Sequence, residues 1–173
     1  MLVKQIPNQY NMKLLKYTAC MFVAATLFTL PFASFAADEK TADNPTLAQP
    51  VKSVLDHYLK IQAALAQDSI KGVDENASAI AKSVRGDEKK LLSSDVATQA
   101  EKLAKAADLT AARDAFQPLS NLLIKYLADN KAGVGTYHEV FCPMVNASWL
   151  QTETDIKNPY LGNAMLSCGE FKN

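Results

Sequence analysis

The sequence predicts a mainly α-helical protein, an antiparallel four-helix bundle followed by a small, irregular, β-containing C-terminal cap. Between Pro50 and Asn130, apolar residues recur at spacings of three and four, which is the period of amphipathic helices. Gly133 and Gly135 then interrupt this pattern, and a short alternating stretch rich in β-forming residues follows at 136–141. The change in period divides one domain, residues 50–173, into a bundle at 50–130 and a cap at 131–173.

Four stretches carry the helical pattern. They run from residue 50 to about 67, from 68 or 69 to about 84, from 93 or 94 to 107, and from 108 or 110 to about 130. Pro50 suits the first turn of the first helix, and Ser or Asp residues stand where the other helices need N-caps. The fourth helix has the widest apolar face, made by Leu109, Ala112, Phe116, Leu119, Leu122, Leu123, Tyr126 and Leu127. Four consecutive helices of this kind, rich in alanine, predict a closely packed antiparallel bundle.

The first 36 residues have the pattern of a signal peptide. Three lysines precede an apolar run at 19–30, and small residues before Ala37 suit a cleavage site after Ala36. The run is too short to span a bilayer comfortably. We therefore expect a periplasmic or secreted protein with no membrane span after cleavage, and a flexible, polar lead-in at 37–49.

The charge balance argues against nucleic acid as a partner. The leader contains three of the 18 basic residues and none of the 18 acidic ones, which leaves 15 basic against 18 acidic residues in the exported chain. Such a chain lacks the basic stripe that phosphate binding requires.

Most of the unusual chemistry is concentrated in the cap. Cys142 and Met144 are two residues apart, so on an extended segment their side chains would leave the same face. Met165 and Cys168 are three apart and would be neighbours on a helical turn. Thiolate and thioether sulfur are soft ligands that select Cu(I), and imidazole suits copper and zinc. These four residues, with His138 as an auxiliary ligand, are therefore candidate metal ligands.

Other interpretations of the same residues stay open. Cys142 and Cys168 can form a disulfide in an exported protein, which would stabilise it by roughly 3 to 4 kcal/mol in the chain-entropy model. Met144 and Met165 can be ordinary core residues. Trp149 is typical of a core or cap aromatic rather than a ring stacked over a cation.

An enzyme is not predicted. His138 is the one candidate base near a cysteine nucleophile, and no orienting Asn or Asp signature accompanies the pair. The sequence also lacks a CxxC motif, a glycine-rich phosphate loop and an HExxH zinc helix.

The cap carries a specific motif, which consists of Phe141-Cys142-Pro143-Met144, Trp149-Leu150, Ile156, Asn158-Pro159-Tyr160, Gly162, Met165-Leu166 and Cys168-Gly169. It resembles the C-terminal signature of a secreted family of unknown function, found alone or attached to adaptor subunits of copper and silver efflux systems. Residues 112–120 resemble the last helix of the same family, and Tyr58-Leu59 with Ala64-Leu65 its first. The FCPM element is also similar to the YTCPMHP core of heavy-metal-binding domains, with Val145 in place of its His.

Motif and resemblance together predict an exported protein that binds Cu(I), or Ag(I), and either buffers copper or delivers it to an efflux system. Trp149 and Tyr160 would support the ligands from behind, and a copper or silver efflux adaptor, or another envelope protein, would be the partner. Zinc stays open as the metal. The alternative is an interaction module of the cell envelope that binds no metal and contains a structural Cys142–Cys168 disulfide.

Overall fold

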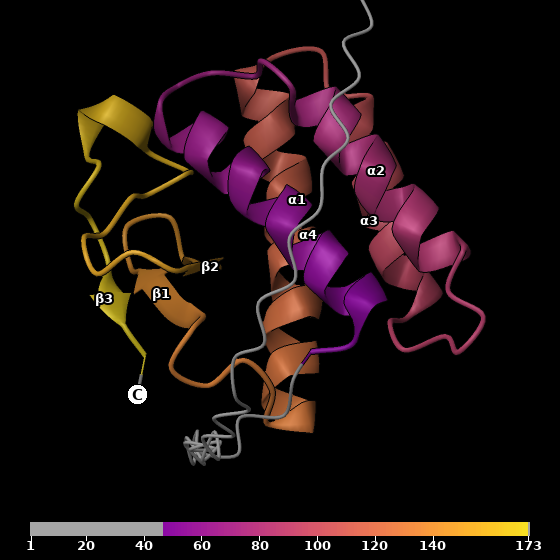
Figure 1. Ribbon diagram of the computed structural model, residues 1–173. Coiled ribbons are helices and arrows are strands. Elements are labelled where there is room, and N and C mark those ends of the chain that lie inside the picture. Colours follow the sequence, from indigo (N-terminus) through magenta and orange to yellow (C-terminus); the bar gives the residue numbers. More distant parts are fainter. Residues whose placement is uncertain (1–46, 173) are drawn as a thin grey trace, which may run out of the picture. The chain divides into compact units, whose positions relative to one another are not determined.

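Four helices dominate the computed structural model, which describes residues 47–172 (Figure 1). They are α1 (Gln49–Ala66), α2 (Val73–Arg85), α3 (Ser94–Ala104) and α4 (Leu109–Asn130). The three strands β1 (His138–Cys142), β2 (Ala147–Gln151) and β3 (Glu170–Phe171) and the 3-10 helix η1 (Gly162–Ala164) follow in the cap. The predicted signal peptide, residues 1–36, and most of the predicted lead-in lie outside the described residues.

The helix ends follow local capping chemistry. Pro50 lies in the first turn of α1, and the Ser93 and Asp108 side chains accept hydrogen bonds from the backbone N–H of Asp95 and Ala111, respectively. These contacts satisfy N–H groups that have no partner inside a helix. The expected start of the second helix at 68 or 69 is wrong, because Asp68 and Gly72 both have positive φ and α2 begins only at Val73.

Each helix packs against the next one in the chain, and α1 and α4 also contact β2. The apolar face predicted for the fourth helix is buried at Ala112, Phe116, Leu119, Leu123 and Leu127. The prediction of a mainly helical protein with four helices is confirmed, and the antiparallel bundle arrangement stays a prediction. None of the helices in the described part of the chain has the length and apolar character needed to span a bilayer.

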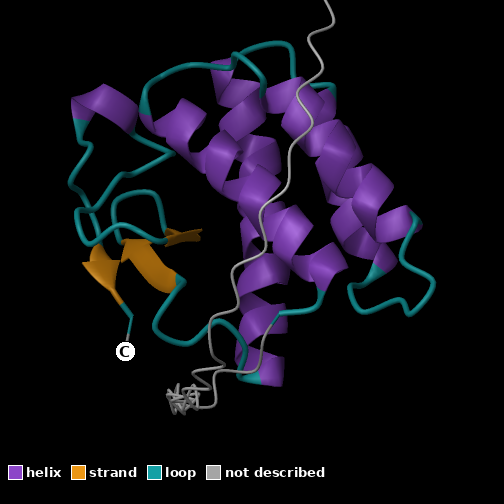
Figure 2. Cartoon of the chain, in the orientation of Figure 1, coloured by secondary structure: helices purple, strands orange, loops and turns teal. Residues whose placement is uncertain are grey.

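The cap contains a three-stranded antiparallel sheet in the order β2-β1-β3 (Figure 2). The strand predicted at 136–141 begins two residues later, because residues 134–136 form a turn in which Gly135 has positive φ. β1 and β2 form a hairpin in which Cys142 pairs with Ala147, and β3 pairs with the other edge of β1 through Val140 and Phe141. The sheet therefore brings the C-terminal end of the chain back beside the end of β1.

Buried polar contacts attach the cap to α1 and α4. The Tyr58 hydroxyl of α1 accepts a hydrogen bond from the Leu150 N–H of β2 at 3.0 Å and lies 2.8 Å from Ser120 Oγ of α4. The Gln62 amide of α1 donates to the Lys157 carbonyl at 2.6 Å. Because buried polar groups cost free energy when they lose their partners, these contacts hold the sheet in one position on the helices.

Candidate metal site in the C-terminal cap

The structure brings the two cysteines of the cap together. Cys142 is the last residue of β1 and is fully buried, whereas Cys168 is half-buried in the loop before β3. Their sulfur atoms lie 2.7 Å apart, and both residues are free thiols in this structure. Since 26 positions separate them in the sequence, the sheet pairing creates this contact and the local sequence does not.

A glycine makes the close approach between the two segments possible. The register of β1 with β3 pairs Phe141 with Glu170, so the next pair in line is Cys142 with Gly169. A Cβ atom on Gly169 would lie 2.9 Å from Trp149 Cη2 and 2.9 Å from Val140 Cγ1, which is closer than real Cβ contacts allow. The bare backbone of Gly169 therefore lets the loop that carries Cys168 lie against the sheet.

The hairpin turn after Cys142 directs backbone donors at its sulfur. Residues 143–146 form the turn, and Asn146 closes it with a φ of 48°, a conformation that Asn tolerates better than most residues. The N–H groups of Met144 and Val145 and the side-chain amide of Asn158 face the Cys142 sulfur closely enough to lower the pKa of its thiol. This arrangement places more partial positive charge around the Cys142 sulfur than around the Cys168 sulfur, which, of these three donors, only the Met144 N–H faces.

The two thiols differ in acidity as a result. Burial raises the pKa of Cys142, but the hydrogen bonds from Cys168, from the amides of Val145 and Met144, and from Asn158 together lower that pKa below the usual value for a thiol. The pKa of Cys168 is raised, first because its thiol donates to the Cys142 sulfur and second because of burial. Cys142 is therefore the sulfur that ionises more readily, and Cys168 supplies the S–H donor.

Asn158 organises the loop that carries Cys168. Asn158 is fully buried, and its Nδ2 donates a hydrogen bond to the Cys168 carbonyl at 2.7 Å. Its Oδ1 accepts from the N–H groups of Tyr160 and Leu161 at 2.8 and 3.0 Å, and its own N–H donates to the Leu166 carbonyl. One buried amide thus fixes both ends of the segment between residues 158 and 168.

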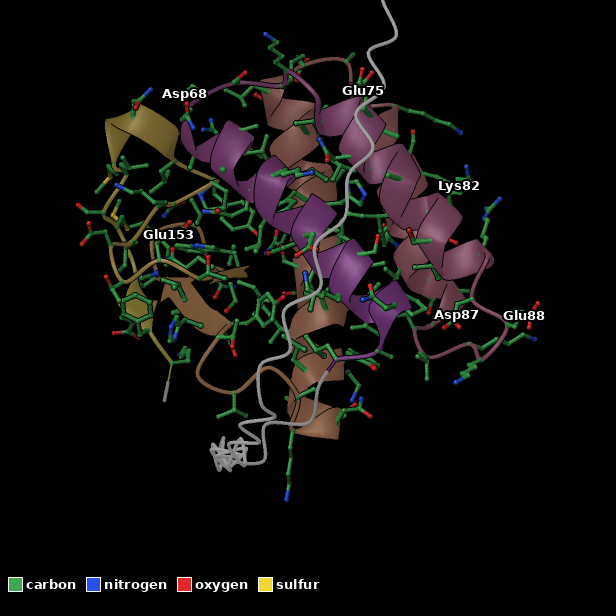
Figure 3. All side chains as sticks on the ribbon, viewed as in Figure 1. Asp68, Glu75, Lys82, Asp87, Glu88 and Glu153 are labelled. Carbon is green, nitrogen blue, oxygen red and sulfur yellow. The ribbon has the colours of Figure 1, made fainter. Side chains whose placement is uncertain are left out.

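An ion pair holds the same loop to the helices. Arg113 of α4 donates through Nε to the Pro159 carbonyl at 2.8 Å and through Nη2 to the Asp68 carboxylate at 2.6 Å. The second Asp68 oxygen accepts from the Asn163 N–H at 3.0 Å. Figure 3 shows Asp68 at the end of α1 beside the C-terminal loop, while Glu75, Lys82, Asp87 and Glu88 lie around α2. The pair therefore connects α1, α4 and the cap.

Gly162 lies against this ion pair, and replacement by alanine should show how closely the loop is packed there. Gly162 has a φ of +54°, and a Cβ atom would contact the Asp68 and Arg113 side chains. Gly135 has a φ of +78° with nothing within 4 Å of a Cβ, so it is a matched control for backbone strain alone. We expect Gly135→Ala to destabilise the fold by about 1 kcal/mol and Gly162→Ala by roughly 1 to 2 kcal/mol more. Urea unfolding of both variants measures the difference, and equal costs would contradict the packing described.

The pH dependence of stability should report the Asp68–Arg113 pair. The Arg113 hydrogen bond, followed by that from the Asn163 N–H, lowers the pKa of Asp68 in the folded state. The unfolded chain then binds the proton more tightly, so the contribution of Asp68 is present above the unfolded pKa and is lost as pH falls through the folded value. Urea unfolding from about pH 6 down to about pH 3 brackets the ordinary aspartate pKa. Wild type should lose more stability over this range than Asp68→Asn, and parallel curves would contradict the assignment.

The two methionines lie at the surface beside the thiol pair. Met144 is 66% exposed and Met165 is 42% exposed. Met144 lies in the hairpin turn, so the expectation that Cys142 and Met144 share an extended face is wrong. Met165 follows η1, and its carbonyl accepts a hydrogen bond from the Cys168 N–H at 3.0 Å, so a tight turn rather than an α-helix brings these two residues together.

The other predicted residues occupy different positions. His138 lies at the opposite end of β1 from Cys142, about 13 Å along a regular strand, and its ring meets Phe171 edge-on. Trp149 is fully buried and donates from Nε1 to Gln151 Oε1 at 3.0 Å. The Tyr160 hydroxyl donates to the Ser148 carbonyl at 2.9 Å, and its ring meets Trp149 edge-on. The structure therefore brings the two cysteines together and leaves His138 apart from them.

The residues that hold the site in place were not singled out from the sequence as site residues. Asn158 stands out in the sequence only as a member of the C-terminal motif, although an Asn directly before Pro is typical of a side chain that caps its own turn. Arg113 and Asp68 gave no signal, because they are 45 residues apart and meet only in the fold. Among residues 47–172, no group of three or more His, Cys, Asp or Glu side chains is placed to hold a metal ion.

Fold and site together define a mainly helical domain whose C-terminal cap contains a pair of adjacent thiols. Residues 54–134 match the model of a family described as Protein of unknown function (DUF3347). The match supports the predicted resemblance to a family of unknown function, but it ends before β1 and so does not include the thiol pair. The C-terminal motif and the link to efflux adaptors stay predictions. Neither a curated protein nor a solved structure shows significant similarity to the chain.

Proposed function

We propose that this protein binds a soft metal ion, Cu(I) or its heavier analogue Ag(I), with the thiolates of Cys142 and Cys168 as the main ligands. The proposal is carried by one observation, the meeting of two free thiols 2.7 Å apart beside a turn whose amides face one of them. Hydrogen bonds from amides stabilise a thiolate, which is the form of cysteine that binds metals.

The composition of the surrounding turns supports a soft ion. Met144 and Met165 lie near the cysteines in sequence and are largely exposed, so their thioethers are free to turn and are the ligands that we propose to complete the coordination shell. Thiolate and thioether together select Cu(I) over hard cations. His138 could join only if β1 changed its conformation, and we place it last among the candidate ligands.

The role we propose is storage or transfer of the ion without catalysis. The leader pattern supports export to the periplasm or beyond, where a thioether keeps its ligand capacity because it cannot form a disulfide. A copper or silver efflux adaptor, or another envelope protein, is the partner we propose from the sequence resemblance. Trp149 and Tyr160 would keep the sheet behind the ligands in place.

A second candidate is an interaction module with a structural Cys142–Cys168 disulfide. It is favoured by the exposure of Met144 and Met165, since exposed methionines can form an adaptable surface for a protein partner. The close sulfur atoms suit this candidate as well.

Titration of the reduced protein with Cu(I), under anaerobic conditions and against a chromophoric chelator of known affinity, tests the first candidate. We expect the protein to remove one equivalent of copper from the chelator. A chelator that keeps all its copper would reject the proposed function and favour the disulfide-containing module. The same titration with Zn²⁺ shows whether the site prefers the softer ion.

A further inference from the structure

The two cysteines differ in how far they can be reached from solvent. Cys142 has no exposed surface, and it lies directly before the turn whose Met144 and Val145 N–H groups face its sulfur. Cys168 is half-buried in a loop between the exposed residue Ser167 and Gly169. Cys168 is therefore the cysteine that a bulky reagent from solvent meets first, whereas Cys142 is shielded from such a reagent.

The distance between the sulfur atoms is compatible with two different states. At 2.7 Å, the atoms need to approach by less than 1 Å to reach the length of a disulfide bond, about 2.05 Å. Two thiolates that share a metal at about 2.3 Å each are separated by at least about 3.7 Å in tetrahedral geometry, so metal binding moves them apart. One pair of sulfurs can serve either state, and each state excludes the other.

We propose that the pair is a thiol switch with divided roles, in which Cys168 reacts with an external low-molecular-weight disulfide and Cys142 resolves the product. Although Cys142 is the more acidic thiol, it is buried, so Cys168 is the one that meets the reagent. Cys168 loses its proton and attacks one sulfur of the small disulfide, a mixed disulfide forms, and one small thiol leaves with that proton. The Cys142 thiolate then attacks the Cys168 sulfur, the mixed disulfide breaks, and the second small thiol leaves. The protein loses two electrons and two protons, and the small disulfide is reduced to two thiols.

The second step requires a sulfur that is already positioned, and the structure provides it. The turn amides and the Asn158 amide face the Cys142 sulfur, and Asn158 also donates to the Cys168 carbonyl. One buried side chain thus contacts both cysteine residues and keeps their sulfur atoms 2.7 Å apart, which favours the resolving attack. This gives Cys142 a high effective concentration toward Cys168 compared with any thiol in solution.

Oxidation by this route would also control the proposed function. This part of the inference rests on metal binding by the same pair, because the disulfide removes both thiolates. The reduced protein would bind the ion, and the oxidised protein would release it and keep the cap closed by a covalent link between β1 and the C-terminal loop.

Oxidised glutathione and intact-mass spectrometry test the roles of the two cysteines. We expect Cys142→Ser to accumulate one glutathione on Cys168, and Cys168→Ser to react at least about tenfold more slowly. Wild type should lose two hydrogens and retain no glutathione. Equal rates for the two variants, or a wild type that retains glutathione, would overturn the assignment.

A second measurement uses the wild type, so it does not depend on whether the variants fold. Wild-type protein is quenched in acid at early times and digested with a protease, and its transient glutathione should be found on Cys168. Early label on Cys142 would reject the proposal even if both variants unfolded.

Copper titration of the reduced and oxidised wild type separates this inference from the proposed function. Loss of copper affinity on oxidation supports the switch. Equal affinity in both forms would reject the control of metal binding, and absence of affinity in both would reject the metal site itself. The order of reaction at the two cysteines is decided by the mass measurements in each case.

Discussion

Serine in place of both Cys142 and Cys168 is expected to abolish competition with the chelator for Cu(I). Each single substitution should weaken binding by about a hundredfold or more, because a hydroxyl is a hard, neutral ligand and structural metal sites derive roughly 3 kcal/mol from each ligand. The expectation follows from the two free thiols that the fold brings within 2.7 Å of each other. Anaerobic competition titration measures the affinity of all three variants.

Ser167→Ala is the matched control for this experiment. Ser167 is exposed and lies next to Cys168 in the same loop, so its replacement tests the loop without removing a sulfur. Urea unfolding of the cysteine variants shows whether a loss of affinity reflects a loss of fold. A double serine variant that is folded and still competes for copper would contradict the ligand assignment.

The methionines can be tested in the same assay. Met144→Leu with Met165→Leu should weaken Cu(I) binding by about tenfold or more, less than the cysteine variants do. Because both side chains are largely exposed, the cost in stability should be small. Unchanged affinity would limit the ligands to the two thiolates and assign the methionines to the surface.

The helices could be predicted because their signal is local. The apolar face of α4 and the caps at Ser93 and Asp108 depend on residues within a few positions of one another. The predicted start of α2 is too early because Asp68 has positive φ where α1 ends, with the Ser69 N–H bonded back to the Ala64 carbonyl, and Gly72 has positive φ directly before Val73. The Asp68 side chain instead binds Arg113 and the Asn163 N–H, which are distant in the sequence.

For the candidate metal site, the types of residue could be predicted from the sequence, but their arrangement in space could not. Cys142 and Cys168 were identified as candidates, but their contact depends on the pairing of β1 with a two-residue strand that has almost no sequence signal of its own. The same pairing explains why a glycine stands at position 169. A Cβ atom there would come too close to Trp149 and Val140, and these contacts arise only in the fold. His138 is a candidate ligand by its residue type and its place in the cap, and neither of these gives its distance from Cys142 along the strand.

Alanine in place of Asn158 should have a large effect on stability as well as on the thiol pair. The substitution removes the donor to the Cys168 carbonyl and leaves the half-buried N–H groups of Tyr160 and Leu161 without their acceptor. A buried group that loses its partner costs about 1 to 3 kcal/mol, so we expect a total loss of roughly 2 to 4 kcal/mol in urea unfolding.

The matched control is Asn130→Ala, since the Asn130 amide also donates to a backbone carbonyl but is exposed at the end of α4. It should cost well under 1 kcal/mol. If Asn158 also positions Cys168, the variant should resolve its mixed disulfide with glutathione more slowly than wild type under conditions where both are folded. A variant that resolves at the wild-type rate would show that the Arg113 contacts and the sheet pairing position Cys168 without Asn158, because those contacts remain intact.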